Sequence, residues 1–479
     1  MKNFLANLCY SLILTTLLIS TSSGESADPG QAIYGSSERQ LQEIQQQLKM
    51  QDAEIRRLRS ELDAAVGASD SHLLPPLPGY AVSQSSPQSS NVEVSNLDAT
   101  LQSLSNGNFT KIGSGTDTGL NLNTYSPLFD KGIVIQSDNV AMKIGGYVKV
   151  DVIQDFQPVG NEAEFDTQTI LIGVPQRQNS NLHAQQSRLN FDTRWDTDLG
   201  QVRAFVEGDF FGDNNTYRLR HAYGEVRQLI VGQTWSTFAN VRAVPPTLDS
   251  AGPASIINQR QSQVRWTQEI LHEGLSFSVA VENPDLTVTN TISDLSVTSV
   301  TDSPDLVTRL LYADEQTSLQ LSGVVRSLGL ITPNGDRFEQ SAWGANASAT
   351  HHFSENDEGY LQFVVGDGIG SYNGIPDVVS DGISRGGLLP MMGWMVAWNH
   401  RWTKKLQSSL TYSENILDNP SYQPGDELHR NTYFSTNLIW SPATHYFMGI
   451  EYLYGIRENV DGQDAEAHRL QTSFGFYLP

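Results

Sequence analysis

The feature that most constrains the fold is a two-residue alternation of apolar and polar side chains that starts near Val140 and runs to the end of the chain. In its first segment Val148 and Val150 lie on either side of Lys149, and comparable segments recur along this part of the chain. Successive side chains of a β-strand point to opposite faces of a sheet, so each segment forms a strand with one apolar and one hydrated face. We therefore expect the chain from 140 onward to be all-β.

The number and length of these segments indicate a barrel that crosses a membrane. We count about sixteen segments of roughly 9–13 residues, the length that crosses a bilayer at a tilt. Short and long connections alternate, as in outer-membrane barrels. The short connections include 197–199, 314–316 and 442–444, and the long ones include 158–183, 239–259, 284–304 and 368–390. We predict a transmembrane antiparallel β-barrel of about 16 strands over 140–479. A soluble β-sandwich would have shorter strands and irregular loops.

The first residues, 1–24, have the pattern of a signal peptide. Lys2 supplies a basic start, an apolar run covers 8–19, and Ser22 to Gly24 offer a small-residue cleavage site. The alternative is an uncleaved membrane anchor, but a run of about twelve residues is too short to span a bilayer as a helix. The single cysteine, Cys9, lies inside this segment, so the processed chain should carry no disulfide or thiolate site.

Residues 38–66 predict a short α-helical coiled coil, and residues 67–135 a linker rich in Pro and Ser. The coil has no Gly or Pro, its apolar positions are three and four residues apart, and Gln51 is the polar position of the seam. An amphipathic helix packed on a domain is the alternative. The apolar seam consists of Leu41, Ile44, Leu48, Ile55, Leu58 and Leu62.

Six motifs in the first half of the predicted barrel resemble the DcaP-like porins. In chain order they are KIGGYVKVD (143–151), QSRL (186–189), VEGDFFG (206–212), RLRHAYG (218–224), GQTWSTF (232–238) and RQSQVRWT (260–267). The resemblance implies a trimeric outer-membrane channel for small anionic or polar solutes, linked to dicarboxylate uptake. It also implies a coiled coil ahead of the barrel, which we expect in the periplasm, and membrane lipid around the wall.

The alternation also predicts which charged side chains face the lumen. If the apolar face contacts lipid, the charges on the other face line the water-filled path, because a charge in lipid costs about 2–4 kcal/mol near mid-membrane. Arginine suits carboxylates because its planar fork binds both oxygens. The alternative for each base is a bracing ion pair within the wall. The predicted lumen residues are Lys149, Arg188, Arg194, Arg203, Arg218, Arg220, Arg265, Arg309, Asp151, Asp192, Glu207 and Asp209.

One long connection, 239–259, lies where the constriction loop of a porin would fold inward. It contains Pro245, Pro246 and Asp249. An ordinary extracellular loop or a trimer contact are the alternatives. Aromatic residues at strand ends should form girdles at the membrane interfaces. These are Trp266, Trp394, Trp402, Trp440 and Tyr454.

The sequence favours no enzyme and no cofactor. It lacks a nucleophile elbow, a phosphate loop and a zinc motif. His351 and His352 lie near Glu355 and Asp357, but at a turn where solvated side chains are the simpler reading, so we expect no metal site there. Asp-rich loops could bind calcium. The net charge of −23 argues against nucleic acid as a partner.

We therefore expect a passive outer-membrane porin with a preference for anions. The alternative is an envelope-structural protein whose barrel anchors it and whose coiled coil tethers or spaces the outer membrane. Only the first of these functions requires an open, conducting lumen.

Overall fold

The computed structural model describes residues 121–123, 133–137, 139–271, 274–290, 297–381, 383 and 385–478. The predicted signal peptide (1–24), the predicted coiled coil (38–66) and the predicted linker (67–135), apart from 121–123 and 133–135, lie outside the described residues. None of the helices within these ranges is long and apolar enough to cross a membrane.

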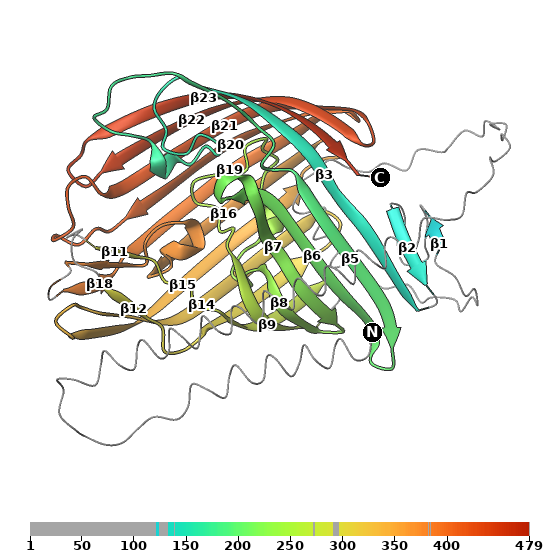
Figure 1. Cartoon of the computed structure of the whole chain (residues 1–479), viewed down its shortest axis with the longest axis horizontal. Helices are drawn as coiled ribbons and strands as arrows, with labels where there is room; N and C mark the ends of the chain where they lie inside the picture. The colour runs from blue at the N-terminus through green and yellow to red at the C-terminus, as the bar shows by residue number, and fades with distance from the viewer. Residues whose placement is uncertain are drawn as a thin grey trace, which may run out of the picture. The chain divides into compact units, whose positions relative to one another are not determined.

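Sixteen antiparallel strands close into a barrel (Figure 1). Closure comes from β23, which pairs with β3 from Tyr477 opposite Tyr147 to Arg469 opposite Asp155. The predicted antiparallel barrel of about 16 strands is confirmed. In order the strands are β3 (Val140–Asp155), β5 (Arg188–Thr197), β6 (Gly200–Gly212), β7 (Thr216–Val226), β8 (Leu229–Trp235), β9 (Arg260–Glu269), β10 (Leu275–Glu282), β13 (Asp305–Ala313), β14 (Thr317–Ile331), β15 (Arg337–His352), β16 (Asp357–Asp367), β19 (Pro390–Thr403), β20 (Leu406–Leu417), β21 (Leu428–Ala443), β22 (Tyr446–Asn459) and β23 (Asp464–Tyr477).

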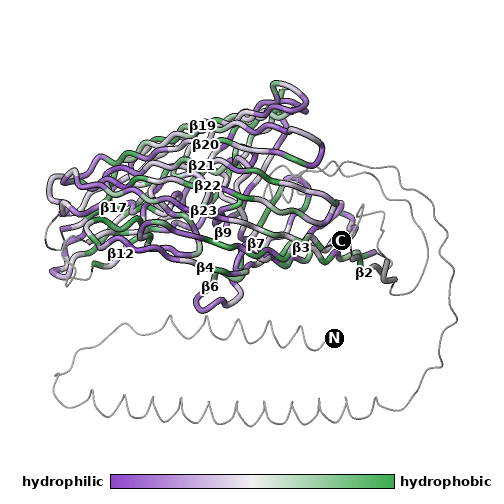
Figure 2. The backbone as a smooth tube through the Cα atoms, turned by 90° about the horizontal axis from the view of Figure 1, so that it is seen from above, coloured by the Kyte–Doolittle hydropathy of each residue, from purple (hydrophilic) through white to green (hydrophobic). Residues whose placement is uncertain are grey.

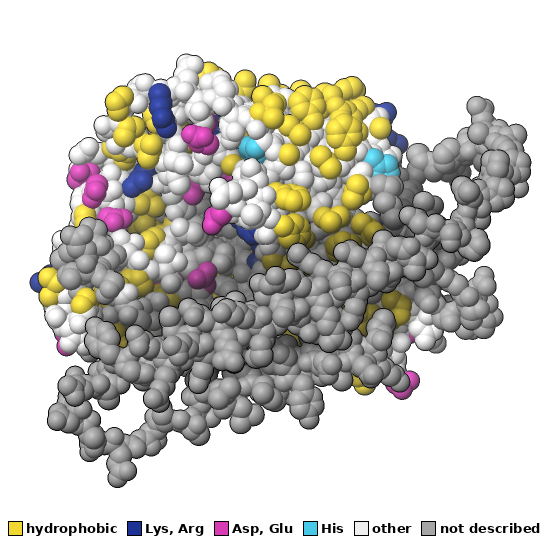
Figure 3. All heavy atoms as spheres, in the orientation of Figure 1, with side chains coloured by type: hydrophobic (Ala, Val, Ile, Leu, Met, Phe, Trp, Pro, Cys, Tyr) yellow, Lys and Arg dark blue, Asp and Glu magenta, His cyan; other side chains and the backbone are white. Residues whose placement is uncertain are grey.

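The alternation along each strand separates an apolar outer face from a polar lumen. Val148 is 51% exposed, whereas Lys149 beside it is 2% exposed. Hydrophobic and hydrophilic positions alternate along the wall in Figure 2, and hydrophobic side chains gather on the part of the outer wall left open in Figure 3. Trp266, Trp402 and Trp440 are among the exposed large hydrophobic residues. The wall thus has the face pattern expected of strands that contact lipid outside and water inside.

The two ends of the barrel differ in their connections. At one end every described connection is a tight turn, such as 198–199 between β5 and β6. At the other end four connections are long. We name three of them L1 (156–187), L3 (236–259) and L6 (368–389), and the fourth spans 283–304, of which 291–296 lie outside the described residues. The predicted alternation is incomplete, because 213–215, 332–336 and 460–463 at this end are also short.

Short elements occupy the loops. L1 contains η1 (Thr167–Thr169) and β4 (Asn179–His183), which pairs with the far half of β3. L3 contains η3 (Val241–Ala243), L6 contains η4 (Gly370–Asn373), and η2 (Asp213–Asn215) joins β6 to β7. The remaining loop strands are β11 (Val288–Asn290), β12 (Thr298–Val300), β17 (Val378–Ser380) and β18 (Gly386–Leu388).

Two strands ahead of the barrel were not predicted. β1 (Asn121–Asn123) and most of β2 (Ile133–Ser137) fall inside the range assigned to the linker. β2 pairs with the start of β3, from Ile133 opposite Ile144 to Ser137 opposite Val140, beyond the last pair that β23 makes. The short apolar run of β2 covers an edge of β3 that β23 leaves unpaired. The chain therefore joins the barrel at its short-turn end (Figure 1).

Candidate functional site

L3 folds inward and crosses the lumen. Its first part is held by β14 and β15, where Ser322 Oγ and Asn346 Nδ2 each donate to the Phe238 carbonyl at 2.9 Å. Its middle is held by β20 and β21, where Ser409 Oγ and Asn437 Nδ2 donate to the Pro246 carbonyl at 2.5 and 2.8 Å. The backbone of a loop inside a barrel needs hydrogen-bond partners, and these polar side chains supply them. The inward constriction loop expected at 239–259 is present.

The far part of L3 is fixed by two strands, β22 and β3, that both neighbour β23. The amides of Leu248 and Asp249 donate to Glu451 Oε2 on β22 at 2.7 and 2.8 Å. Lys149 Nζ on β3 donates to the Leu248 carbonyl at 2.6 Å. A carboxylate that accepts two amides restrains the backbone strongly, because charge-assisted hydrogen bonds exceed neutral ones in strength.

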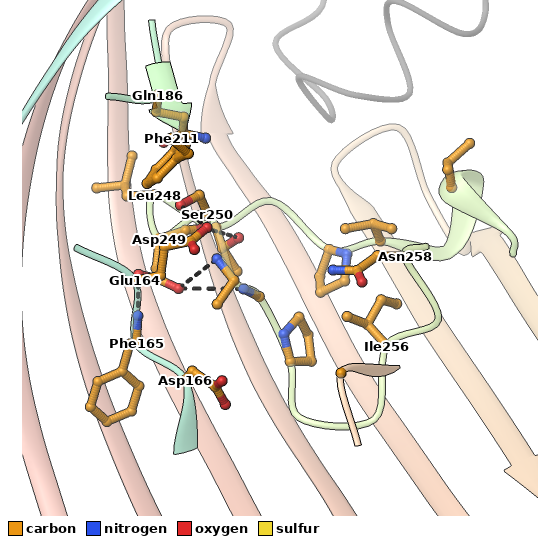
Figure 4. Close-up of a pocket in the computed structure, with 18 of the residues that line it drawn as sticks. Glu164, Phe165, Asp166, Gln186, Phe211, Leu248, Asp249, Ser250, Ile256 and Asn258 are labelled. Atoms are coloured by element: carbon orange, nitrogen blue, oxygen red, sulfur yellow. Dashed lines mark hydrogen bonds between the residues drawn. The ribbon is translucent and has the colours of Figure 1, made fainter. Parts of the chain in front are cut away.

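L1 and L6 pack against L3. The Phe165 amide donates to Asp249 Oδ1 at 2.9 Å, and Ser250 Oγ donates to Glu164 Oε1 at 2.9 Å (Figure 4). From L6, Asn373 Nδ2 donates to the Ile256 carbonyl of L3 at 2.7 Å. The three loops therefore narrow the lumen together.

Two fully buried arginines attach the loops to the wall. Arg469 on β23 contacts Asp155 at 2.6 Å and donates to the Asn161 carbonyl of L1 at 3.0 Å. Arg326 on β14 contacts Asp305 at 2.8 Å and Asp377 of L6 at 2.9 Å. Neither was among the predicted site residues, although both lie on the polar face of a strand.

A cavity of about 440 Å³ remains between the loops and β3 to β9. Five basic side chains line one side, and we call them the basic wall. They are Lys149, Arg188, Arg218, Arg220 and Arg260. Three carboxylates of L1 and L3 line the cavity as well, and we call them the acidic rim. They are Glu164, Asp166 and Asp249 (Figure 4).

Buried carboxylates brace the basic wall. Asp209 contacts Arg218 at 2.8 Å and Arg220 at 3.0 Å, while Glu207 contacts Arg220 at 3.1 Å. These carboxylates are at most 1% exposed, whereas the Arg218 side chain is 38% exposed. Water in the cavity therefore meets the guanidinium group of Arg218, and the orientation of this group is fixed by an acid that the water does not reach.

A β-bulge brings Arg220 into this wall. Between β6 and β7 the register runs from Glu207 opposite His221 to Gly208 opposite Leu219, so Arg220 has no partner position. Arg220 and His221 are both buried, whereas Leu219 is 45% exposed on the outer face. A bulge re-aims side chains in this way, and it lets two neighbouring residues point into the lumen.

The predicted lumen residues divide into three groups. The first comprises Lys149, Arg188, Arg218 and Arg220 in the basic wall, with Asp151, Glu207 and Asp209 behind it. In the second, Asp192 binds Arg194 at 2.9 Å and Arg203 at 3.0 Å, away from the cavity. The third, Arg265 and Arg309, does not line the cavity. Sequence reasoning missed Arg260, Glu164 and Asp166, of which the last two lie in L1, where no alternation identifies them.

The environment of two members of the acidic rim, Glu164 and Asp166, disfavours their negative charge. Burial raises the pKa of the Glu164 carboxyl above its ordinary value, and repulsion from Asp249 raises it further. Burial likewise raises the pKa of Asp166, although the Gln168 amide that donates to it acts in the opposite direction. Both carboxyl groups therefore bind protons more readily than exposed carboxyls do.

The described residues contain no group of three His, Cys, Asp or Glu side chains placed to hold a metal ion. His351 and His352 have separate partners: Nδ1 of His351 lies 2.9 Å from Thr317 Oγ1, and Nε2 of His352 lies 3.5 Å from Glu358.

Comparison with known proteins gives one family match. The family model described as DcaP outer membrane protein matches residues 104–477. No curated protein matches the chain. Among solved structures, the outer membrane channel DcaP of Acinetobacter baumannii is similar with a TM-score of 0.64 and 18% identity, covering 71% of this chain and 97% of that one. An anion-selective porin from Comamonas acidovorans matches with a TM-score of 0.47 and 11% identity over 71% of this chain and 99% of its own.

Proposed function

The chain belongs to the DcaP outer membrane protein family, and we propose that it forms a passive, water-filled channel that favours small anions such as carboxylates and dicarboxylates. Its family and its closed barrel make it an outer-membrane, porin-like protein. The observation that carries the proposal is the basic wall, whose arginines line the cavity inside the barrel.

The arrangement of charges explains how an anion could enter and leave. A polar solute crosses a pore where protein charges and dipoles replace its hydration, provided that binding stays weak enough for release. The guanidinium groups of Arg188, Arg218 and Arg220 supply the attraction. Their buried partners Glu207 and Asp209 keep each base partly neutralised, which limits how tightly an anion is held.

We further propose a homotrimer whose coiled coil (38–66) lies in the periplasm. A coiled-coil seam joins helices of several chains, and its polar position Gln51 can fix their number. The barrel supports this placement, since β2 enters at the short-turn end, which faces the periplasm in barrels of this type.

Conductance tests the channel directly. The purified protein in a planar bilayer should give discrete conductance steps, and in a KCl gradient its reversal potential should have the sign of an anion-selective pore. Detergent without protein is the control. A barrel that inserts but never conducts would contradict the proposal and favour the envelope-structural alternative.

Acidification should increase the anion preference. The pKa values of Glu164 and Asp166 are raised, so on lowering the pH from 7 they lose their charge before the ordinary carboxyl values of 4.5 and 3.8 are reached. The arginines of the basic wall stay charged, so the cavity becomes more positive. The measurement is the reversal potential across a pH series.

The matched variant for this measurement is E164Q/D166N. It should already have the stronger anion preference at pH 7 and should respond less to acidification. An unchanged pH response in this variant would show that other groups are responsible.

A further inference from the structure

Three arginines form a second basic cluster inside the barrel, apart from the cavity. Arg265 on β9 and Arg309 on β13 point into the lumen, because their neighbours Val264 and Leu310 are exposed on the outer face. Arg242 comes from η3 of L3. None of the three lines the cavity, and Arg265 lies about 17 Å along β9 from Arg260, at 3.4 Å per residue.

The strand between two of these arginines carries small side chains at the facing positions. On β10, Ala280 lies opposite Arg265 and Ser278 lies opposite Arg309. Arg309 Nη2 donates to Ser278 Oγ at 3.1 Å. Small side chains on β10 thus separate two long guanidinium side chains that share one face of the sheet.

These three arginines differ from the other lumen arginines in having no carboxylate partner. Whereas Arg194, Arg203, Arg218 and Arg220 each contact an acid, Arg242, Arg265 and Arg309 form no ion pair within the described part of the chain. In the same part of the chain the Nε atoms of Arg265 and Arg309 are buried without a hydrogen-bond partner. Buried polar and charged groups usually have partners, so these atoms remain available to an acceptor.

The nearby acids are already engaged. The negative charge of Glu282 attracts Arg309. The oxygens of Glu282 already accept hydrogen bonds, however, from Ser236 Oγ at 2.6 Å and from the Thr237 amide at 2.7 Å. Glu225 lies 3.6 Å from Arg203. Arg242 and Arg265 both repel the charge of Arg309. Three cations therefore face two carboxylates, one of which also pairs with Arg203, so the cluster keeps a net positive charge.

We propose that Arg242, Arg265 and Arg309 form a second anion site, which binds a small oxyanion with two negative charges, such as a dicarboxylate or a phosphate. The site deepens the proposed channel function and rests on it, because its ligand must reach the lumen. The Nε–H groups supply the donors, and planar guanidinium groups bind paired oxygens well. Since Arg242 belongs to L3, a bound anion would bridge the constriction loop and the wall.

Titration calorimetry on the purified full-length protein in detergent tests this site, with succinate in one arm and inorganic phosphate in the other. Binding of either supports the site and identifies the source of its oxyanion. In R265Q/R309Q the dissociation constant should rise about tenfold or more, because each lost charge-assisted hydrogen bond weakens binding by roughly that factor. The control R194Q, whose arginine pairs with Asp192, should change it less than about twofold.

Two more variants serve as controls. R309K keeps a positive charge but lacks the planar guanidinium group. Its affinity should lie between those of the wild type and R265Q/R309Q, which would show that the substituted site still folds. R385Q removes an exposed arginine of L6 that belongs to neither cluster and should retain the binding. No binding in the wild type, or equal binding in R265Q/R309Q, would overturn the site. If the protein conducts but does not bind these anions, the second site is wrong and the channel function stands. If it binds them but does not conduct, the channel function is wrong and the site stands.

Discussion

Replacing Arg188, Arg218 and Arg220 together by glutamine should turn an anion-selective channel into a cation-selective one. The substitution removes three cations from the basic wall and leaves Glu207 and Asp209 without their arginine partners. With the acidic rim unchanged, the cavity becomes negative. The ratio of anion to cation permeability should fall by about tenfold or more, since about 1.4 kcal/mol corresponds to a factor of ten. The reversal potential in a KCl gradient measures it.

Two controls separate local charge from general effects. Adding E207Q and D209N to the triple variant removes the unpaired acids and should bring selectivity back toward neutral. R385Q removes an arginine of L6 whose side chain is 65% exposed and should leave the reversal potential nearly unchanged. If the triple variant kept the anion preference of the wild type, the basic wall would not determine selectivity.

Replacing Arg469 by methionine should cause the largest loss of stability. The Arg469 side chain is fully buried between Asp155 at 2.6 Å and Asp249 at 3.8 Å. Removing one partner of a buried ion pair leaves an uncompensated charge and typically costs about 3–5 kcal/mol. The free energy of unfolding, measured by urea titration in lipid vesicles, should fall by that amount. L1 also loses its attachment at Asn161, so the conductance should become noisier.

The acids beside Arg469 provide the rescue. R469M/D155N/D249N removes the charges that R469M leaves unpaired and should recover part of the lost stability. The exposed R385M is the matched control, and it should stay within about 0.5 kcal/mol of the wild type. A full loss in the triple variant would mean that packing rather than charge explains the role of Arg469.

The barrel wall could be predicted from the sequence because the pattern that specifies it lies within each single strand. Alternation at every second residue assigns Val148 to the outer face and Lys149 to the lumen without knowledge of any other strand. The strand β2 escaped this reasoning, because five residues without a clear alternation cannot be told from a linker.

The site could be predicted only in part because it depends on contacts between distant residues. The basic wall was largely found, since its members lie on strands. That the acidic rim lines the same cavity as the basic wall could not be predicted. This arrangement depends on contacts such as that between the Phe165 amide and Asp249, which are 84 positions apart in the chain. The bulge at Arg220 and the burial of Arg326 likewise depend on the register between strands, which the sequence of one strand does not specify.

The contacts that hold L3 fix the path of its backbone but not the side chains that it presents to the lumen. Wall side chains bind mainly the backbone of L3, as at the Phe238, Pro246 and Leu248 carbonyls. A main-chain carbonyl is the same whichever side chain its residue carries. Positions along L3 whose side chains make no such contact can therefore vary without shifting the path of the loop. Such a channel could acquire new solutes in evolution by changing what its loop presents, while the wall that supports the loop remains constant.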